Sequence, residues 1–221
     1  MIITEQKPLA EIIESLAGKT KIFLVGCGDC ATACNTGGET QVSQIKKQLE
    51  EQGKTVVGMC VPDAACVAAK LKVSTAKQIP AMRQAEAAVI FSCGLGVQSF
   101  KDNDRLNLTV LPGCNTLSGA VLDSQGNLWE KCAMCGQCVL GKTSGICPVA
   151  LCSKGILNGP CGGMNKGKCE LDPDRDCAWV LIYNEALKKN SIDALKKIQP
   201  PRDHKKAMKP HKLIVKQAVT P

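Results

Sequence analysis

The stretch Lys21-Ile-Phe-Leu-Val-Gly26 is an apolar run between a charged residue and a glycine, and it predicts a buried β-strand. Three similar runs follow it, and stretches with the apolar spacing of helices lie between them. Strands that alternate with helices in this way are typical of a parallel sheet that is covered on both faces. The further strand candidates are Thr55-Val-Val-Gly-Met59, Ala87-Ala-Val-Ile-Phe-Ser92 and Asn107-Leu-Thr-Val-Leu111.

Three helical stretches accompany these strands. The first lies within residues 8–18, the second ends near Gly53, and the third spans residues 62–84 with a break before Pro80. We therefore expect an α/β fold in which residues 1–118 form a flavodoxin-like parallel sheet domain. Its four strands would take the order 2-1-3-4.

Cysteines follow the predicted strands of this domain. Cys27, Cys30 and Cys34 follow the first strand, Cys93 follows the third, and Cys114 follows the fourth. An open parallel sheet binds ligands beyond the carboxyl ends of its strands, at the point where the strand order reverses. With the order 2-1-3-4, the sequence predicts a metal centre made of Cys27, Cys30, Cys34 and either Cys93 or Cys114.

Two other interpretations of these cysteines remain open. Gly26-Cys-Gly-Asp-Cys-Ala31 also matches the dinucleotide-binding pattern G-x-G-x-x-A. However, the second strand ends at Met59-Cys60 and not in the acidic residue that would hold a ribose. Alternatively, the thiols are buried structural groups, an interpretation that fits Cys66 on its predicted helix best and Cys60 less well.

The character of the sequence changes near Ser118. Residues 120–129 have the pattern of a hairpin, and a cysteine-rich segment follows them. We expect a small cysteine-rich iron-sulfur domain in residues 119–190 and a basic tail in residues 191–221. The domain would end in a helix with one apolar face, formed by Trp179, Ile182, Tyr183 and Ala186.

Eight cysteines lie between residues 132 and 177, and the first three form a C-x-x-C-x-x-C run. This spacing lets one loop supply three thiolates to a 4Fe-4S cluster, whereas zinc sites usually combine two separate C-x-x-C pairs. We expect two 4Fe-4S clusters, or three with the N-terminal centre; zinc at one or both C-terminal sites is the alternative. The expected ligands are Cys132, Cys135, Cys138, Cys147, Cys152, Cys161, Cys169 and Cys177.

The composition excludes several classes of protein. The only histidines are His204 and His211, so neither a Ser-His or Cys-His hydrolase nor a two-cysteine, two-histidine zinc finger fits. No apolar run reaches the roughly 18 residues of a membrane span, and the N-terminus has no recognisable signal peptide. We expect a cytoplasmic protein, because reduced cysteine clusters there more often bind metal than form disulfides.

The net charge of +8 lies in one part of the chain. Residues 186–221 carry ten Lys or Arg against Asp193 and Asp203, whereas the charges of residues 1–185 balance at 18 each. The tail is either a solvated, partly disordered segment or a docking segment for an acidic redox partner. Because no aromatic residues are interleaved with its charges, nucleic acid is a poorer candidate partner.

Several motifs together resemble a known family. Gly26–Gly38 and Ser92–Gln98 resemble the N-terminal half of the small iron-sulfur subunit (MetV type) of bacterial methylenetetrahydrofolate reductase. The likeness covers about residues 20–190. Five further motifs are similar to the C-terminal domain family of that reductase: Cys132-x-x-Cys-x-x-Cys138, Thr143-Ser-Gly-Ile-Cys-Pro148, Leu157-Asn-Gly-Pro-Cys-Gly-Gly163, Gly167-Lys-Cys-Glu170 and Cys177-Ala-Trp179 with Ile182-Tyr183. The most specific part of the likeness is Asn158-Gly-Pro-Cys-Gly-Gly163.

The resemblance implies an accessory electron-transfer subunit that is not catalytic alone and contributes no catalytic residue. Its partner would be a barrel-shaped flavoprotein that holds the FMN and reduces 5,10-methylene- to 5-methyltetrahydrofolate. Electrons would come from a low-potential donor such as ferredoxin or a larger redox complex, and pass through the 4Fe-4S clusters to the flavin. The alternative from another class is a zinc-binding module whose basic tail contacts nucleic acid.

Overall fold

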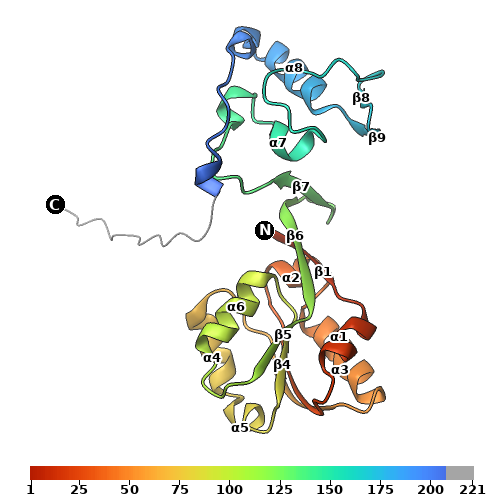
Figure 1. Cartoon of the computed structure of the whole chain (residues 1–221), viewed down its shortest axis with the longest axis vertical. Coiled ribbons are helices and arrows are strands. Elements are labelled where there is room, and N and C mark those ends of the chain that lie inside the picture. The colour runs from red at the N-terminus through yellow and green to blue at the C-terminus, as the bar shows by residue number, and fades with distance from the viewer. Residues whose placement is uncertain (208–221) are drawn as a thin grey trace, which may run out of the picture. The chain divides into compact units, whose positions relative to one another are not determined.

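The computed structural model describes residues 1–207 and divides the chain into two units, Met1–Trp129 and Glu130–Pro221 (Figure 1). The boundary expected near residue 118 falls inside a long strand of the first unit. The end of the expected basic tail, residues 208–221, lies outside the described residues.

The first unit contains the expected parallel sheet. Its strands take the order β3-β2-β4-β5, so the predicted order is confirmed. The central strand β2 has a parallel neighbour on each side, with Ile22 opposite both Val56 and Ala87. The strands are β2 (Lys21–Val25), β3 (Thr55–Cys60), β4 (Ala87–Ile90) and β5 (Thr109–Pro112).

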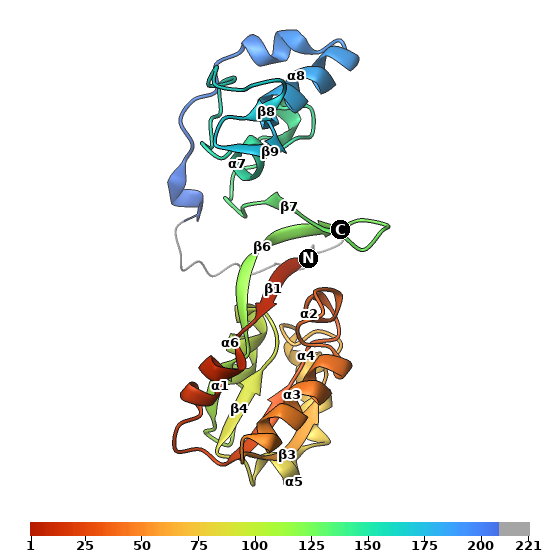
Figure 2. The ribbon, with the colours of Figure 1, turned by 90° about the vertical axis from the view of Figure 1, so that its right-hand side faces the viewer.

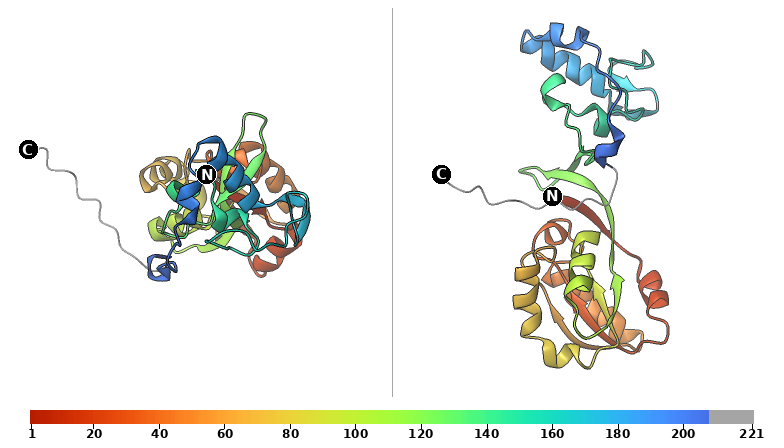
Figure 3. Two further views of the ribbon diagram at one scale, coloured as in Figure 1. Left: turned by 90° about the horizontal axis from the view of Figure 1, so that it is seen from above. Right: turned by 60° about the vertical axis from the view of Figure 1, so that its left-hand side comes forward.

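Helices cover both faces of this sheet (Figures 1 and 3). One face packs against α1 (Leu9–Ser15) and α3 (Glu39–Glu51). The other face packs against α4 (Ala68–Ala76), α5 (Ile79–Met82) and α6 (Gly94–Asn103). A single helical turn, α2 (Cys30–Ala33), follows the carboxyl end of β2.

The side chains of β2 alternate between two hydrophobic cores. Ile22 and Leu24 pack on the α1 and α3 side, whereas Phe23 and Val25 pack on the α4 to α6 side. All four are fully buried. Because successive side chains of a strand point to opposite faces, a central strand covered on both sides must be apolar throughout.

The chain also contains an antiparallel sheet, whose first two strands lie in the first unit and whose third strand extends past Trp129, the last residue of that unit. This sheet has the order β1-β6-β7, formed by β1 (Ile2–Gln6), β6 (Cys114–Leu122) and β7 (Leu128–Cys132). Figure 2 shows β1 beside β6, and Thr4 lies opposite Thr116. The sequence did not predict β1, because its partner is more than a hundred residues away and five residues of mixed polarity carry no clear period.

The predicted hairpin is present between β6 and β7, and Asp123 organises its turn. The Asp123 carboxylate accepts the indole N–H of Trp129 at 2.8 Å and the backbone N–H groups of Gln125 and Asn127 at 2.9 and 2.8 Å. These hydrogen bonds hold the pKa of Asp123 well below its usual range, and the bond from Trp129 has the largest effect. The turn is therefore fixed by one side chain.

The second unit contains little regular structure. Its longest element is α8 (Ala178–Lys188), which buries Trp179, Ile182 and Ala186 as expected. The remaining elements are short: η1 (Leu140–Lys142), α7 (Pro148–Leu151), β8 (Lys168–Cys169), β9 (Asp172–Asp176), η2 (Ile192–Lys196) and η3 (His204–Ala207).

The expectation that Tyr183 joins this buried face is wrong. Tyr183 is 50% exposed, and it lines an apolar groove of about 590 Å³ together with Trp179 and Gly159. An exposed position suits tyrosine, because its ring can cover apolar atoms while the hydroxyl stays in contact with water.

The described part of the tail, residues 191–207, contains two short 3-10 helices. Besides η2 and η3, it makes hydrogen bonds back to the cysteine-rich loops. Gln199 and Asn158 exchange two hydrogen bonds of 2.7 and 3.0 Å, and Arg202 Nη2 donates to the Cys135 carbonyl at 3.4 Å. These contacts attach the beginning of the tail to the second unit.

The helical region predicted for residues 62–84 also needs correction. α4 begins only at Ala68, and residues 62–67 form a turn that contains Cys66. Cys66 is consequently exposed in a turn and is not a buried thiol on a helix. Pro80 lies in the first turn of α5, where its missing N–H costs no helical hydrogen bond.

Within residues 1–207, no helix is both long and apolar enough to cross a membrane.

Glu86 ties together the beginnings of β2 and β4. Its carboxylate accepts the backbone N–H groups of Thr20 and Lys21 at 2.6 and 2.8 Å. These hydrogen bonds lower the pKa of Glu86 from 4.5 to about 2, and the bond from the Lys21 N–H has the largest effect. A carboxylate with a lowered pKa stabilises the fold above its unfolded pKa, and this contribution is lost as the pH falls through the folded value.

We therefore predict that acid weakens the fold through Glu86 between pH 4.5 and about pH 2. The Glu86→Gln variant should show a smaller decrease of Tm over this range than the unmodified chain, measured by circular dichroism. Glu51→Gln, at an exposed position of α3, is the matched control. An identical pH dependence of Tm in the Glu86→Gln variant and the unmodified chain would contradict the assignment.

Candidate metal centres

The N-terminal cysteines lie at the carboxyl end of the parallel sheet, where the sequence predicted them. Cys27 follows β2, Cys30 begins α2, and Cys93 directly precedes α6. Figures 1 and 2 show α2 at this end of the sheet. Cys27 and Cys93 are buried and Cys30 is half-buried.

Close backbone contacts fix the loop after β2. Gly26 N–H donates to the Cys60 carbonyl and Cys27 N–H donates to the Gly37 carbonyl, both at 2.8 Å. A Cβ atom at Gly26 would collide with the Gly37 carbonyl, and one at Gly37 would collide with the Phe91 carbonyl. Only glycine therefore permits this approach of the three chain segments, which sets the position of Cys27.

The thiols of Cys27, Cys30 and Cys93 are close enough to interact electrostatically. Burial raises the pKa of the Cys30 thiol, and the negative charges of Asp29, Cys27 and Cys93 raise it further. Three of the five cysteines that the sequence assigned to this centre thus follow or precede elements at one end of the sheet. The turn that contains Cys66 is anchored to the loop after β2 by the hydrogen bond from Gly28 N–H to the Pro62 carbonyl, which the sequence did not predict.

The other two predicted ligands, Cys34 and Cys114, contact different groups. The Cys34 Sγ lies 3.6 Å from the Ile2 carbonyl oxygen, and the Cys114 Sγ lies 3.7 Å from the Thr36 carbonyl oxygen. Burial raises the pKa of Cys114 to about 12. Cys114 also packs within the core on the α1 and α3 side of the sheet.

Cys60 was open to interpretation as a structural thiol. It is partly buried against the core on the α4 to α6 side, and desolvation raises its pKa to about 12. A structural thiol that packs among apolar side chains is usually inert. The environment of Cys60 therefore fits a structural role.

In the second unit, four cysteines that are distant in sequence line one small cavity. They lie at the end of α7, in the loop after Pro160, on β8 and directly before α8. Trp179 closes one side of the cavity and donates its indole N–H to the Ile156 carbonyl at 2.8 Å. The four cysteines are Cys152, Cys161, Cys169 and Cys177.

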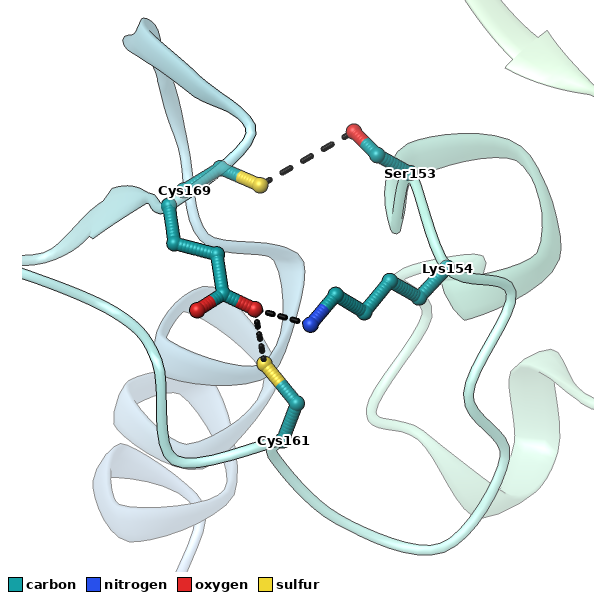
Figure 4. A network of polar contacts seen from close by, with 5 residues as sticks. Ser153, Lys154, Cys161 and Cys169 are labelled. Atoms are coloured by element: carbon teal, nitrogen blue, oxygen red, sulfur yellow. Dashed lines mark hydrogen bonds and ion pairs between the residues drawn. The ribbon is translucent and has the colours of Figure 1, made fainter.

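An ion pair between Lys154 and Glu170 lies beside these thiols (Figure 4). The Glu170 carboxylate is 3.5 Å from the Cys161 Sγ, and the Cys169 Sγ is 3.8 Å from the Ser153 hydroxyl. A Cβ atom at Gly163 would collide with the Glu170 carboxylate, so this glycine leaves room for it. The hydrogen bond from Lys154 lowers the pKa of Glu170, and a backbone hydrogen bond at Leu171 lowers that of Cys169.

The C-x-x-C-x-x-C loop forms a tight turn of its own. Met134 and Gly136 both have positive φ angles, of 49° and 75°, which fold the loop back between its thiols. The Cys132 Sγ accepts the N–H of Met134 at 3.4 Å. Cys147, directly before α7, is the one C-terminal cysteine left to complete a second group of four with Cys132, Cys135 and Cys138.

No three Cys, His, Asp or Glu side chains among residues 1–207 are close enough to hold a single metal ion. A four-iron cluster separates its thiolate ligands by iron and sulfide atoms, so its ligands stand farther apart than those of one tetrahedral zinc ion. The donor sets, made of thiols and free of histidine, fit iron-sulfur ligation in their chemistry.

Residues 111–205 match the family described as methylene-tetrahydrofolate reductase C terminal. The resemblance inferred from the motifs is therefore confirmed for this segment, which contains all eight C-terminal cysteines. The match also reaches residue 205, beyond the point where the sequence motifs end. Neither the curated proteins nor the solved structures yield a match to this chain.

The close contact at Gly37 leads to a stability prediction. Gly37→Ala should destabilise the chain by about 1–3 kcal/mol, because the added methyl group must displace the backbone at Phe91. Gly141→Ala is the control, since a Cβ atom there meets nothing within 4 Å. Equal free energies of unfolding for the two variants in urea would show that the loop relaxes without cost.

The cavity in the second unit leads to a prediction about metal content. Cys161→Ala and the Cys161→Ala/Cys177→Ala double variant should lose the same amount of metal, because both thiols would belong to one site. In a Cys135→Ala/Cys161→Ala variant, the amount of metal lost should instead equal the sum of the losses in the two single variants. Metal analysis after anaerobic reconstitution measures both. An additive loss in the Cys161/Cys177 pair would separate these thiols into different sites.

Proposed function

We propose that this chain, whose residues 111–205 match the methylene-tetrahydrofolate reductase C-terminal family, is the electron-transferring iron-sulfur subunit of such a reductase. Its partner would be a barrel-shaped subunit that carries FMN and reduces 5,10-methylene- to 5-methyltetrahydrofolate. The observation that carries the proposal is the combination of the family match with eight cysteines in the matched segment, three of them in a C-x-x-C-x-x-C loop.

The cysteines would hold 4Fe-4S clusters, which supply single-electron transfer when they are bound. In the second unit, one group of ligands would be the four cysteines that line the cavity, Cys152, Cys161, Cys169 and Cys177. The other group would consist of the three thiols of the C-x-x-C-x-x-C loop and Cys147. A third cluster would be held at the carboxyl end of the N-terminal sheet. Iron and zinc analysis distinguishes these clusters from four-thiolate zinc sites.

The surrounding residues support this role in two ways. In the first unit, backbone contacts of Gly26 and Gly37 hold Cys27 in place, and burial of Cys27 and Cys93 keeps water away from them. In the second unit, the ammonium group of Lys154 lies close enough to Cys161 and Cys169 to interact with their charges. A nearby cation stabilises deprotonated thiols, which are the form that binds metal.

We assign the folate chemistry to the partner because the sequence contains no complete motif for a cofactor that transfers hydride. The dinucleotide pattern is incomplete, and the described residues 1–207 form the parallel sheet domain and the cysteine-rich unit and not a β/α barrel. We infer a cytoplasmic complex in which a ferredoxin or a larger redox complex supplies electrons at low potential.

The proposal predicts a dependence of flavin reduction on this chain. When the two subunits are combined, a low-potential donor should reduce the FMN of the partner much faster with this chain than without it. The isolated chain should show no folate reductase activity. Absorbance of the flavin under anaerobic conditions measures the rate.

Cys135→Ala provides the variant for this experiment, and Cys60→Ala is the matched control because the Cys60 thiol packs against a hydrophobic core. The first variant should slow flavin reduction strongly and the second should leave it near the rate of the unmodified chain. Equal rates of flavin reduction with and without the chain would refute the electron-transfer role.

A further inference from the structure

The turn before α4, residues 62–67, brings an additional thiol to the carboxyl end of the parallel sheet. Gly28 N–H donates to the Pro62 carbonyl at 2.8 Å, which anchors this turn to the loop after β2. Cys66 lies near the end of the turn and is exposed. It therefore sits at the same end of the sheet as Cys27.

The neighbouring residue Ala65 shows how closely this turn packs. Ala65 is fully buried and forms a small buried cluster with Cys27 and Ala31. On its other side, a Cβ atom at Gly96 would lie 3.0 Å from the Ala65 Cβ. Gly96 belongs to the first turn of α6, and its N–H donates to the Cys93 carbonyl at 2.9 Å. Ala65 is thus packed between the loop of Cys27 and the helix that Cys93 precedes.

Of the two competing cysteines, Cys114 is less suitably placed, because its thiol is directed to the carbonyl of Thr36. The Cys34 thiol contacts the carbonyl of Ile2, and the Cys30 thiol also bonds to the Ile2 backbone, so the choice between Cys34 and Cys66 rests on the packing of the turn. Cys114 lies within electrostatic range of Cys93, but it is only 4% exposed and belongs to the hydrophobic core on the α1 and α3 side. A thiol packed in that core would have to leave its apolar neighbours in order to bind a cluster.

We propose that Cys66 completes the N-terminal centre with Cys27, Cys30 and Cys93, and that these four thiols hold an iron-sulfur cluster. The inference rests on the proposed function for the nature of the metal group, but the choice of the four thiols comes from the packing of the turn. Two of the four, Cys27 and Cys93, are buried, whereas Cys66 is at the surface. The cluster would therefore lie at the edge of the unit, where electrons can enter or leave.

The test uses the full-length chain, reconstituted anaerobically with iron and sulfide. Cys66→Ala should lose about four iron atoms per chain, the content of one 4Fe-4S cluster. Cys34→Ala is the matched control, because its thiol is half-buried in the same region, and it should keep its iron. Circular dichroism should show both variants folded, since Cys66 is exposed and its loss leaves no cavity.

A second measurement does not depend on substitution. Iodoacetamide should modify Cys66 in the metal-free chain and not in the reconstituted chain, while Cys60 should stay unmodified in both because its thiol is buried and its pKa is raised to about 12. Peptide mass analysis identifies the modified thiols.

Full iron content in Cys66→Ala, or equal iron loss in Cys34→Ala, would overturn the assignment. If Cys27→Ala also keeps all its iron, the first unit holds no cluster, and the assignment fails for that reason. Neither result decides the proposed function, because that depends on flavin reduction and on the separate Cys135→Ala variant.

Discussion

The burial of β2 on both faces is the constraint on which the first unit depends. Its side chains fill two cores, and it pairs with a parallel strand on each side, so its carboxyl end cannot move independently of the sheet. The loop that follows is held by the carbonyls of Cys60 and Gly37. The position of Cys27 is therefore set by the backbone and not by the metal that it would bind.

Much of this fold could be predicted because its signals are local. The run from Lys21 to Gly26 is apolar at every position except its ends, and that pattern is sufficient to identify a central strand. β1 was missed, because five residues gain their structure only by pairing with β6 far along the chain. The exposure of Tyr183 was also not predicted, because it depends on which distant residues pack beside α8, whereas the helix itself follows from local spacing.

The candidate sites likewise include one that the local sequence reveals and others that depend on the fold. The C-x-x-C-x-x-C loop is recognisable because its three thiols are neighbours in sequence. Cys152, Cys161, Cys169 and Cys177 come from four separate segments, and only the fold brings them to one cavity. Cys66 could not be assigned from its spacing, because its location follows from the packing of Ala65 between the loop of Cys27 and helix α6. The sequence thus identifies which cysteines are candidate ligands, whereas their grouping depends on the fold.

The two units also differ in how their thiols are held. In the first unit, hydrogen bonds between backbone groups and close contacts at glycine place the thiols on a sheet with two cores. In the second unit, most thiols lie in loops, and an exposed ion pair such as Lys154–Glu170 stabilises a fold by little. A segment with few buried apolar contacts gains much of its stability from metal ligation, because the free energy of binding is then also free energy of folding. The cysteines of the second unit would thus have a structural role as well as the proposed redox role, whereas those of the first unit are attached to a sheet with a buried hydrophobic core on each face.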